Sequence, residues 1–323
     1  MHLLVTGGAG FIGSAYVRRL LGGAEPAGAR LTALTVLDSL SYAGNRANLA
    51  PVAADPRLRF VHGSVTDAAL LAELLPGVDA VVHLAAETHV DRSITGAAPF
   101  VTTNVLGTQT LLQAALETGL PRLLQVSTDE VYGSIAQGSW REDAPLDPNS
   151  PYAASKAAAD LLALAYARTH GLNLTITRCG NNYGPYQYPE KVVPLFVTNL
   201  LRGRQVPLYG DGLNVRDWIH VDDHCRGLQV ALDHGAPGEV YHIAGTTELT
   251  NRQLTARLLD QCGADWSAVR PVADRPAHDR RYSLDDTKLR ALGYRPEVPF
   301  EAGLADTVAW YREHEHWWRP RVD

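Results

Sequence analysis

Two adjacent carboxylates and a tyrosine–lysine pair are the side chains of this sequence best suited to acid–base chemistry. Asp129 and Glu130 come just after the apolar run Leu123–Ser127. Tyr152 and Lys156 are four residues apart at the start of a predicted helix, so both lie on one face of it. Crowding of like charges helps to keep one carboxyl group protonated, so neighbouring carboxylates can act as an acid and a base. These residues predict a site that moves protons.

A glycine-rich turn near the start of the chain could hold the phosphates of a dinucleotide. Gly7, Gly10 and Gly13 follow the apolar run Leu3–Thr6 and open the next predicted helix. Glycine permits a tight turn and close approach of a pyrophosphate, and the helix N-terminus offers unpaired N–H groups. Asp38 ends the second predicted strand, where a carboxylate accepts from a ribose 2′-hydroxyl and repels a 2′-phosphate. The pattern predicts NAD, rather than NADP, as the cofactor.

Apolar runs that alternate with helical segments predict the scaffold behind these residues. The run Ala80–Ala85 is continuous, as is typical of a parallel strand that is covered on both faces. The predicted strands are 3–6, 31–37, 59–62, 80–85, 123–127, 174–177 and 239–243. The predicted helices are 11–21, 68–75, 103–117, 153–169 and 221–234. The predicted fold class is therefore α/β, with a doubly wound parallel Rossmann sheet.

Proline and glycine become more frequent after residue 180, so the composition of the chain changes there. We expect an NAD-binding Rossmann domain over residues 1–180, with part of 213–246 returning to it. Residues 181–323 are expected to form a smaller, mostly helical C-terminal substrate lobe. The length of 323 residues agrees with about two domains.

Composition excludes several classes of protein. Hydrophobic residues make up 46% and charged residues 20%, which excludes a disordered chain. The formal net charge of −6 argues against nucleic-acid binding, and the lack of a run of 18 apolar residues argues against a membrane partner. Three cysteines without metal or redox spacing fit reduced thiols. We expect a cytoplasmic protein.

Two histidine-rich stretches resemble metal-binding patterns but favour structural roles. His220, Asp222, Asp223 and His224 fit a strand followed by a helix, with Asp222 or Asp223 as its N-cap. The stretch 313–316 fits the solvated face of a helical tail. We therefore expect no metal.

The glycine motif T-G-G-A-G-F-I-G and the motif Y-x-x-x-K together resemble the extended short-chain dehydrogenase/reductase family. Further motifs, in the same order along nearly the whole chain, resemble the dTDP-glucose 4,6-dehydratase family. They are His83–Ser93, Ser127–Gly133, Thr177–Lys191, Tyr209–His224 and Ala273–Asp285. The segment between Gly133 and Tyr152 is short, which is similar to the enzymes of antibiotic deoxysugar pathways.

This resemblance implies conversion of dTDP-glucose to dTDP-4-keto-6-deoxyglucose and water by a hydro-lyase with one recycled NAD. Oxidation at C4 makes the C5 hydrogen acidic, elimination removes water across C5 and C6, and reduction at C6 completes the reaction. Tyr152 would take the 4-hydroxyl proton, its pKa lowered by Lys156 and the nicotinamide charge. Thr128 would hydrogen-bond the same oxygen. Glu130 would remove the C5 proton, and Asp129 would protonate the departing 6-hydroxyl.

The resemblance also implies binding roles and a homodimer. The residues expected to bind NAD are Gly7, Gly10, Phe11, Ile12, Gly13, Asp38, Ser39, Leu40, Ser41, Gly44, Ser64, Val65, Leu84, Ala85, Ala86, Thr103, Tyr152, Lys156 and Asn182. Those expected to bind the nucleotide sugar are Thr88, Thr128, Asn181, Lys191, Val192, Pro207, Leu208, Tyr209, Arg216, Asn251, Asp274 and His278. Ser64 departs from the family pattern, which usually has an aspartate there to accept from the adenine amino group.

Three other functions share parts of this pattern. An NAD-dependent nucleotide-sugar 4-epimerase would use Tyr152 and Lys156 but has no use for an adjacent acid and base. A GDP-mannose-type dehydratase would use NADP, which Asp38 disfavours. A non-catalytic NAD-sensing regulator could lose Tyr152 and Lys156 freely, yet both are present.

Overall fold

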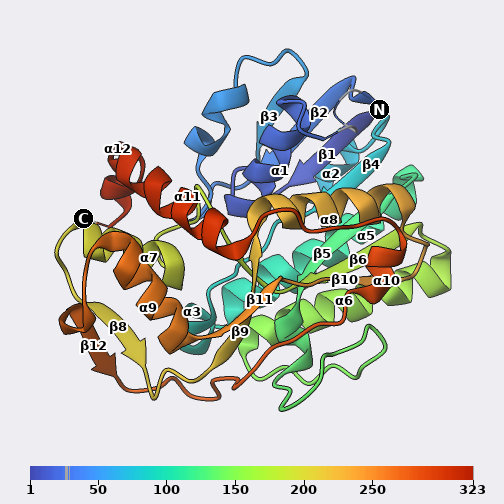
Figure 1. Cartoon of the computed structure of the whole chain (residues 1–323). Coiled ribbons are helices and arrows are strands. Elements are labelled where there is room, and N and C mark those ends of the chain that lie inside the picture. Colours follow the sequence, from blue (N-terminus) through green and yellow to red (C-terminus); the bar gives the residue numbers. More distant parts are fainter. Residues whose placement is uncertain (26–27, 29, 323) are drawn as a thin grey trace.

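A parallel sheet runs through the centre of the molecule (Figure 1). The computed structural model describes residues 1–25, 28 and 30–322, and over these residues the sheet has seven strands in the order β10-β6-β5-β4-β1-β2-β3. The strands are β1 (His2–Thr6), β2 (Ala33–Asp38), β3 (Leu58–His62), β4 (Ala80–His83), β5 (Leu123–Thr128), β6 (Leu174–Cys179) and β10 (Val240–Ile243). All neighbours are parallel, and this confirms the predicted doubly wound fold.

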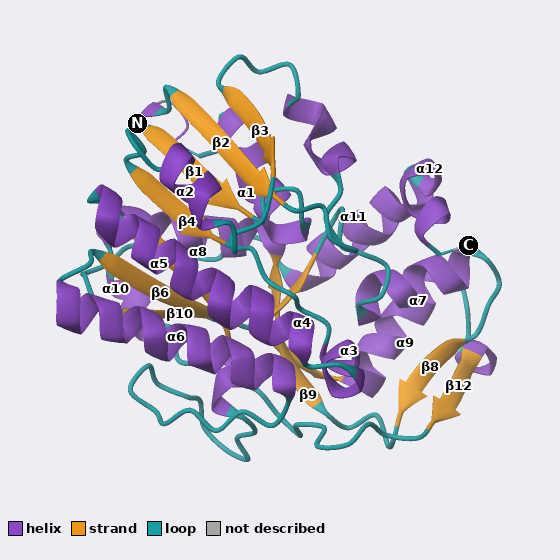
Figure 2. Ribbon diagram, turned by 180° about the vertical axis from the view of Figure 1, so that it is seen from behind, coloured by secondary structure: helices purple, strands orange, loops and turns teal. Residues whose placement is uncertain are grey.

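Helices cover both faces of this sheet, so its inner strands are buried on both sides, whereas the edge strand β3 is only partly buried. One face packs on α1 (Phe11–Leu21) and α8 (Val221–His234). The other packs on α2 (Ala68–Leu74), α5 (Gly107–Thr118) and α6 (Pro151–His170), which lie side by side in Figure 2. The short helices α3 (Val90–Thr95), α4 (Ala98–Phe100) and α10 (Thr287–Ala291), the π-helical turn η3 (Val101–Leu106) and the 3₁₀ turn η2 (Arg46–Val52) complete this part.

The C-terminal lobe has its own core, built largely from aromatic side chains such as Trp218, Phe300 and Trp318. Its helices are α7 (Val192–Leu201), α9 (Asn251–Cys262), α11 (Phe300–Glu313) and α12 (Glu315–Trp318). Two small sheets join them: β11 (Thr247–Thr250), β9 (Val215–His220) and β7 (Asn181–Tyr183) form one, and β12 (Val269–Val272) and β8 (Val206–Tyr209) form the other. The strands β7, β8, β11 and β12, each three or four residues long, were not predicted.

The helix that carries Tyr152 and Lys156 has clear start and stop signals. Ser150 caps α6 by accepting a hydrogen bond from the backbone N–H of Ala153 at 3.1 Å, and Pro151 is its first residue. Gly171 ends the helix in the left-handed conformation, with φ of 68°. These signals place Tyr152 in the first turn of α6, beside the end of β5.

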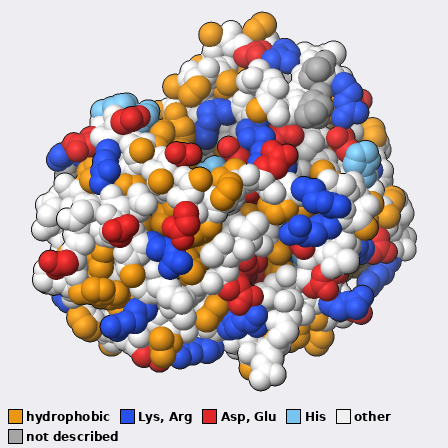
Figure 3. All heavy atoms as spheres, in the orientation of Figure 1, with side chains coloured by type: hydrophobic (Ala, Val, Ile, Leu, Met, Phe, Trp, Pro, Cys, Tyr) orange, Lys and Arg blue, Asp and Glu red, His pale blue; other side chains and the backbone are white. Residues whose placement is uncertain are grey.

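Acidic and basic side chains are interspersed over the face of the molecule shown in Figure 3. No helix among the residues that the structure describes is long and apolar enough to cross a membrane.

Candidate active site

A cleft opens at the carboxyl ends of the central strands, as expected for a doubly wound sheet. It has an empty volume of about 1600 Å³, including space open to solvent. Its walls contain the glycine turn after β1, Asp38 at the end of β2, and the catalytic candidates near the end of β5 and the start of α6. The cleft therefore brings the predicted dinucleotide residues and the predicted proton-transfer residues into one site.

The glycine turn leaves room that a side chain would fill. A Cβ atom at Gly7, where φ is +69°, would lie 2.7 Å from the backbone nitrogen of Ala85. A Cβ atom at Gly13 would lie 2.3 Å from the carbonyl oxygen of Gly7. Only glycine therefore fits at these two positions. At Gly7 it lets the glycine turn pass close to the residues after β4, and at Gly13 it lets the first turn of α1 lie against the glycine turn. This surface fits a dinucleotide pyrophosphate at the start of α1.

Asp38 is nearly buried, and its carboxylate connects the glycine turn after β1 to the loop after β2. Its Oδ2 accepts from the backbone N–H of Ala9, and its Oδ1 accepts from that of Leu40, both at 2.8 Å. Burial raises the pKa of Asp38, and these backbone hydrogen bonds oppose the rise. Each oxygen keeps a second lone pair, so the carboxylate can still accept from ribose hydroxyls. The residues present therefore fit NAD.

Most of the residues expected to bind NAD line this cleft. Leu40 is outside the lining among the described residues and contributes only its backbone N–H to Asp38. Ser64 lines the cleft, but its hydroxyl bonds within its own turn, to the Thr66 hydroxyl at 2.8 Å and from the Thr66 N–H at 3.2 Å. Its role toward the adenine stays a prediction.

The tyrosine–lysine pair is buried at the base of the cleft. Lys156 donates from Nζ to the carbonyl oxygen of Val126 at 2.7 Å, which fixes the lysine against β5. Burial raises the pKa of Tyr152, and the Glu130 charge raises it further. In the protein without NAD the pKa of Tyr152 is therefore raised overall, and its predicted lowering by Lys156 together with the nicotinamide charge stays a prediction. A positive charge bound beside the phenol would act in the opposite direction.

The two adjacent carboxyl groups have different surroundings. Asp129 is only 2% exposed, and its Oδ2 has no hydrogen-bond partner among the described residues. Burial raises the pKa of Asp129 well above its usual range, and the charges of Glu130 and Asp217 add to the rise. Burial also raises the pKa of Glu130, but the cations Lys191, Arg275 and Arg216 oppose it. This difference favours Asp129 as the protonated acid and Glu130 as the base.

Thr128 joins these carboxyl groups to the strand that precedes them. Its hydroxyl donates to Asp129 Oδ1 at 3.2 Å and accepts from the backbone N–H of Glu130 at 3.3 Å. It thereby caps the 3₁₀ turn η4 (Asp129–Tyr132). Its predicted hydrogen bond to the sugar 4-oxygen stays a prediction.

Residues expected to hold the nucleotide sugar divide into two groups. Thr88, Thr128, Asn181 and Lys191 line the cleft, and Lys191 donates from Nζ to the Thr88 carbonyl oxygen at 2.7 Å. The lining, among the described residues, does not include Val192, Pro207, Leu208, Tyr209, Arg216, Asn251, Asp274 or His278.

Several residues of the second group already form polar contacts in the C-terminal lobe. Arg216 is nearly buried, with its guanidinium 4.3 Å from the centre of the Tyr282 ring and 2.9 Å from the carbonyl oxygen of Asp279. His278 and Asp274 form a hydrogen bond of 2.6 Å. Because Arg216 also acts on the pKa of both Asp129 and Glu130, this part of the lobe lies next to the acid–base pair.

Several cleft residues were not singled out from the sequence. They are Leu37, Tyr42, Ala43, Gly63, Glu87, Val126, Ser127, Cys179, Gly180, Gln187, Tyr188 and Glu190. Ser127 ends a predicted strand, and Cys179 lies two residues beyond the predicted strand 174–177, at the end of β6; this position after an apolar run is a signal that could have found them. Tyr42 and Glu190 hydrogen-bond at 2.8 Å although 148 residues separate them, and no local pattern signals such a contact.

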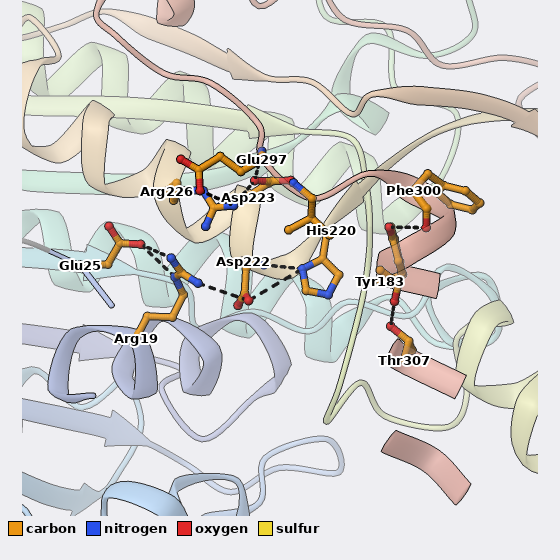
Figure 4. Close-up of polar contacts among 12 residues, drawn as sticks. Arg19, Glu25, Tyr183, His220, Asp222, Asp223, Arg226, Glu297, Phe300 and Thr307 are labelled. Atoms are coloured by element: carbon orange, nitrogen blue, oxygen red, sulfur yellow. Dashed lines mark hydrogen bonds and ion pairs between the residues drawn. The ribbon is translucent and has the colours of Figure 1, made fainter. Parts of the chain in front are cut away.

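The histidine–aspartate stretch after β9 serves the fold (Figure 4). His220 itself caps α8, because its Nδ1 accepts from the backbone N–H of Asp222 at 3.2 Å. The prediction of Asp222 or Asp223 as the cap is therefore wrong by two or three residues. The Asp223 carboxylate instead accepts from the backbone N–H groups of Glu297 and Val298, at 2.7 and 3.0 Å. Within the described part of the chain, no cluster of His, Cys, Asp and Glu could hold a metal ion.

Comparison with known proteins places this site in a family. The family model described as GDP-mannose 4,6 dehydratase matches residues 4–307. The dTDP-glucose 4,6-dehydratases of Streptomyces antibioticus and Streptomyces niveus are 61% and 59% identical, over 99% of this chain and 95% of each relative. The crystal structure of DesIV, a dTDP-glucose 4,6-dehydratase from Streptomyces venezuelae with NAD bound, is 67% identical, with a TM-score of 0.98 over 99% of this chain and 100% of that one. Similarity of this extent in sequence, fold and length shows that the chain belongs to the dTDP-glucose 4,6-dehydratase family.

Proposed function

We propose that this protein is an NAD-dependent hydro-lyase that converts dTDP-glucose to dTDP-4-keto-6-deoxyglucose and water. One observation carries the proposal: Asp129 and Glu130 lie in the same cleft as Tyr152 and Lys156 but in different electrostatic surroundings. Oxidation at C4 needs only the tyrosine–lysine pair. A second acid and a second base are needed only if water also leaves.

The chain's own residues divide the chemistry among them. Bound NAD supplies the acceptor and donor of hydride, and the glycine turn with Asp38 holds it. Tyr152 accepts the proton of the sugar 4-hydroxyl, and Lys156 keeps positive charge close to that oxygen.

Asp129 and Glu130, the two carboxyl groups after β5, then carry out the elimination. Once C4 is a ketone, removal of the C5 proton gives an enolate, so a carboxylate is a strong enough base. Glu130, with three cations acting on it, provides that carboxylate. Asp129 gives its proton to the 6-oxygen, which leaves as water, and burial keeps this acid protonated beforehand.

The C-terminal lobe, within residues 181–323, binds the nucleotide sugar in this account, and residues 1–180, with part of 213–246 returning to them, bind NAD. The Arg216 guanidinium offers a planar pair of donors suited to a diphosphate. Lys191 lies where the lobe meets the cleft and acts on the Glu130 carboxylate. The lobe therefore carries the charges that recognise the diphosphate, and it also carries all three cations that lower the pKa of the base, Lys191, Arg216 and Arg275.

We also propose a cytoplasmic homodimer. Cys179, Cys225 and Cys262 are all free thiols, as is common in reducing compartments. Leu161 of α6 is 58% exposed and Leu106 of η3 is 51% exposed, so large apolar side chains face outward from these two neighbouring segments and could be covered by a second copy. Sedimentation of the purified protein tests this, and a single monomeric species at micromolar concentration contradicts it.

Incubation with dTDP-glucose and NAD tests the proposed reaction. The expected product is lighter by one water and gives the alkali-induced absorbance of a 4-keto sugar. A 4-epimerase would instead return a product of unchanged mass, and that result would contradict the proposal.

A further inference from the structure

A buried chain of hydrogen bonds begins directly behind the acid–base pair. Tyr132, only 1% exposed, ends the same 3₁₀ turn that begins with Asp129. Its hydroxyl hydrogen-bonds to Nη1 of Arg178, and also to Nε2 of His242 at 2.7 Å. The other ring nitrogen of His242, Nδ1, lies 3.0 Å from the carbonyl oxygen of Asp285. This series of hydrogen bonds thus links the catalytic turn, which is η4 with Asp129 and Glu130, to β6, to β10 and to the segment before α10.

The donors and acceptors assign a direction to each hydrogen bond in this series, although the Tyr132 hydroxyl has a second, more distant acceptor in the Glu142 carbonyl oxygen at 3.5 Å. The Asp285 carbonyl can only accept, so Nδ1 of His242 carries the hydrogen. Burial lowers the pKa of His242 to about 3, so the ring is neutral and its Nε2 must accept. Tyr132 therefore donates to His242, and Arg178 donates to the Tyr132 oxygen. A hydroxyl with a donor on one side and an acceptor on the other has a single favoured orientation.

Aromatic and ionic contacts hold the same tyrosine from the sides. The Tyr132 ring stacks on Trp140, with centroids 5.7 Å apart and planes 23° apart. Arg178 lies 4.8 Å from the ring centre and pairs with the buried carboxylate of Asp160 at 2.9 Å. Asp160 follows Lys156 by one turn of α6. The side chain that ends the catalytic turn is therefore packed against the helix that carries the tyrosine–lysine pair.

The residue after Tyr132 removes the remaining freedom of the turn. Gly133 has φ of +71°, and a Cβ atom there would lie 2.4 Å from the carbonyl oxygen of Asp147. Thr128 holds the start of the turn through its hydrogen bonds to Asp129 and Glu130. The short turn is thus fixed at both ends, and its two carboxyl groups have little freedom to move.

We propose that Tyr132 is a positioning residue for the elimination step, and that its hydroxyl, held between Arg178 and His242, aims Asp129 and Glu130 at the sugar. The inference rests on the proposed function, because it assigns Tyr132 to one step of that reaction. It separates Tyr132 from Tyr152, which serves C4 oxidation. A displacement of reacting groups by about 1 Å is enough to slow a reaction by about 100-fold.

Tyr132→Phe tests the inference, because it removes the hydroxyl and keeps the ring. Elimination should slow by about 10- to 100-fold, with KM for dTDP-glucose and the rate of C4 oxidation unchanged. Reduced nicotinamide, seen in the near-ultraviolet during a single turnover, should then accumulate. The alkaline limb of the pH–rate profile should also move to lower pH, because a looser turn admits water to Asp129 and lowers its pKa.

Tyr16→Phe is the matched control. Tyr16 is also fully buried, and its hydroxyl donates to Gln229 Oε1 at 2.6 Å, on the α1 side of the sheet. This variant should lose a similar amount of thermal stability and keep the wild-type rate of elimination. Equal slowing of both variants, or of neither, would overturn the inference.

Two substitutions of the acceptor keep the test decisive if Tyr132→Phe does not fold. His242→Gln keeps an amide that can accept from Tyr132, and it should retain most of the activity. His242→Leu offers no acceptor, and it should slow elimination while sparing oxidation. If both variants eliminate water equally fast, the inference fails. A wild-type protein that does not dehydrate dTDP-glucose would overturn the proposed function as well, whereas an active wild type with unaffected variants overturns the inference alone.

Discussion

Replacing Asp129 by asparagine should stop the reaction after C4 oxidation. Asparagine has the same shape and can still accept the Thr128 hydrogen bond, now 3.2 Å long, but it cannot give a proton to the 6-oxygen. Loss of general-acid help costs roughly 10²–10⁴ in rate. The Asp129 Oδ2 has no hydrogen-bond partner among the described residues, so the substitution breaks no hydrogen bond of the fold at that atom. Elimination should therefore fall by this factor in a protein that is still folded.

Stability against pH gives an independent check on the same residue. The fold raises the pKa of Asp129, so the folded protein holds this proton more tightly than the unfolded chain does. Stability from this group is present at low pH and is lost as the pH rises through the folded-state pKa. Asp129→Asn should remove that loss, so its melting temperature should fall less on the alkaline side than that of the wild type.

The assay follows both half-reactions in a single turnover. Near-ultraviolet absorbance reports reduction of bound nicotinamide, and mass spectrometry of the quenched sugar reports loss of water. Asp143→Asn, in an exposed loop, is the matched control and should behave as wild type. If Asp129→Asn eliminates water at the wild-type rate, Asp129 is not the acid, and the assignment of roles within the pair is refuted.

Three further predictions follow from the same geometry. Glu130→Gln should oxidise C4 but release product roughly 10²–10⁴ more slowly, measured in the same single-turnover assay, and a wild-type rate would exclude Glu130 as the base. The elimination rate should be bell-shaped with pH, rising as Glu130 ionises and falling as Asp129 ionises; because burial raises both pKa values, both limbs should lie above the usual carboxyl range, and an acidic optimum would contradict this. Gly13→Ala should abolish retention of NAD on gel filtration, because the new Cβ would lie 2.3 Å from the Gly7 carbonyl oxygen. Retention of NAD as in the wild type would contradict the assignment of the glycine turn to the pyrophosphate.

The central sheet and one half of the site were predictable because their signals are local. Continuous apolar runs mark buried parallel strands, and glycine or acidic residues directly after such runs lie at one edge of the sheet. Gly7, Asp38 and Asp129 each end a strand in this way, and the structure places all three in the cleft. Their neighbours in sequence were sufficient to place them.

The remaining features depend on contacts between distant residues. Tyr132 and His242 are 110 residues apart, and the charges of Lys191 and Arg216 that lower the pKa of Glu130 come from segments of the C-terminal lobe that are distant from it in sequence. The raised pKa of Tyr152 in the protein alone could not be predicted from its motif, because a motif shows the neighbouring lysine but not the extent of the tyrosine's burial. Burial is a property of the whole fold, so such shifts need the structure.

Transfer of hydrogen from C4 to C6 within one turnover tests the central claim most directly. The protein is incubated with dTDP-glucose that carries deuterium at C4, and the product is examined by mass spectrometry and nuclear magnetic resonance. Because Tyr152, Glu130 and Asp129 act in one cleft on one bound sugar, the account predicts a 4-keto product with deuterium in its C6 methyl group. Loss of the deuterium to solvent would contradict the account, and so would a sugar that keeps its deuterium at C4 and has not lost water.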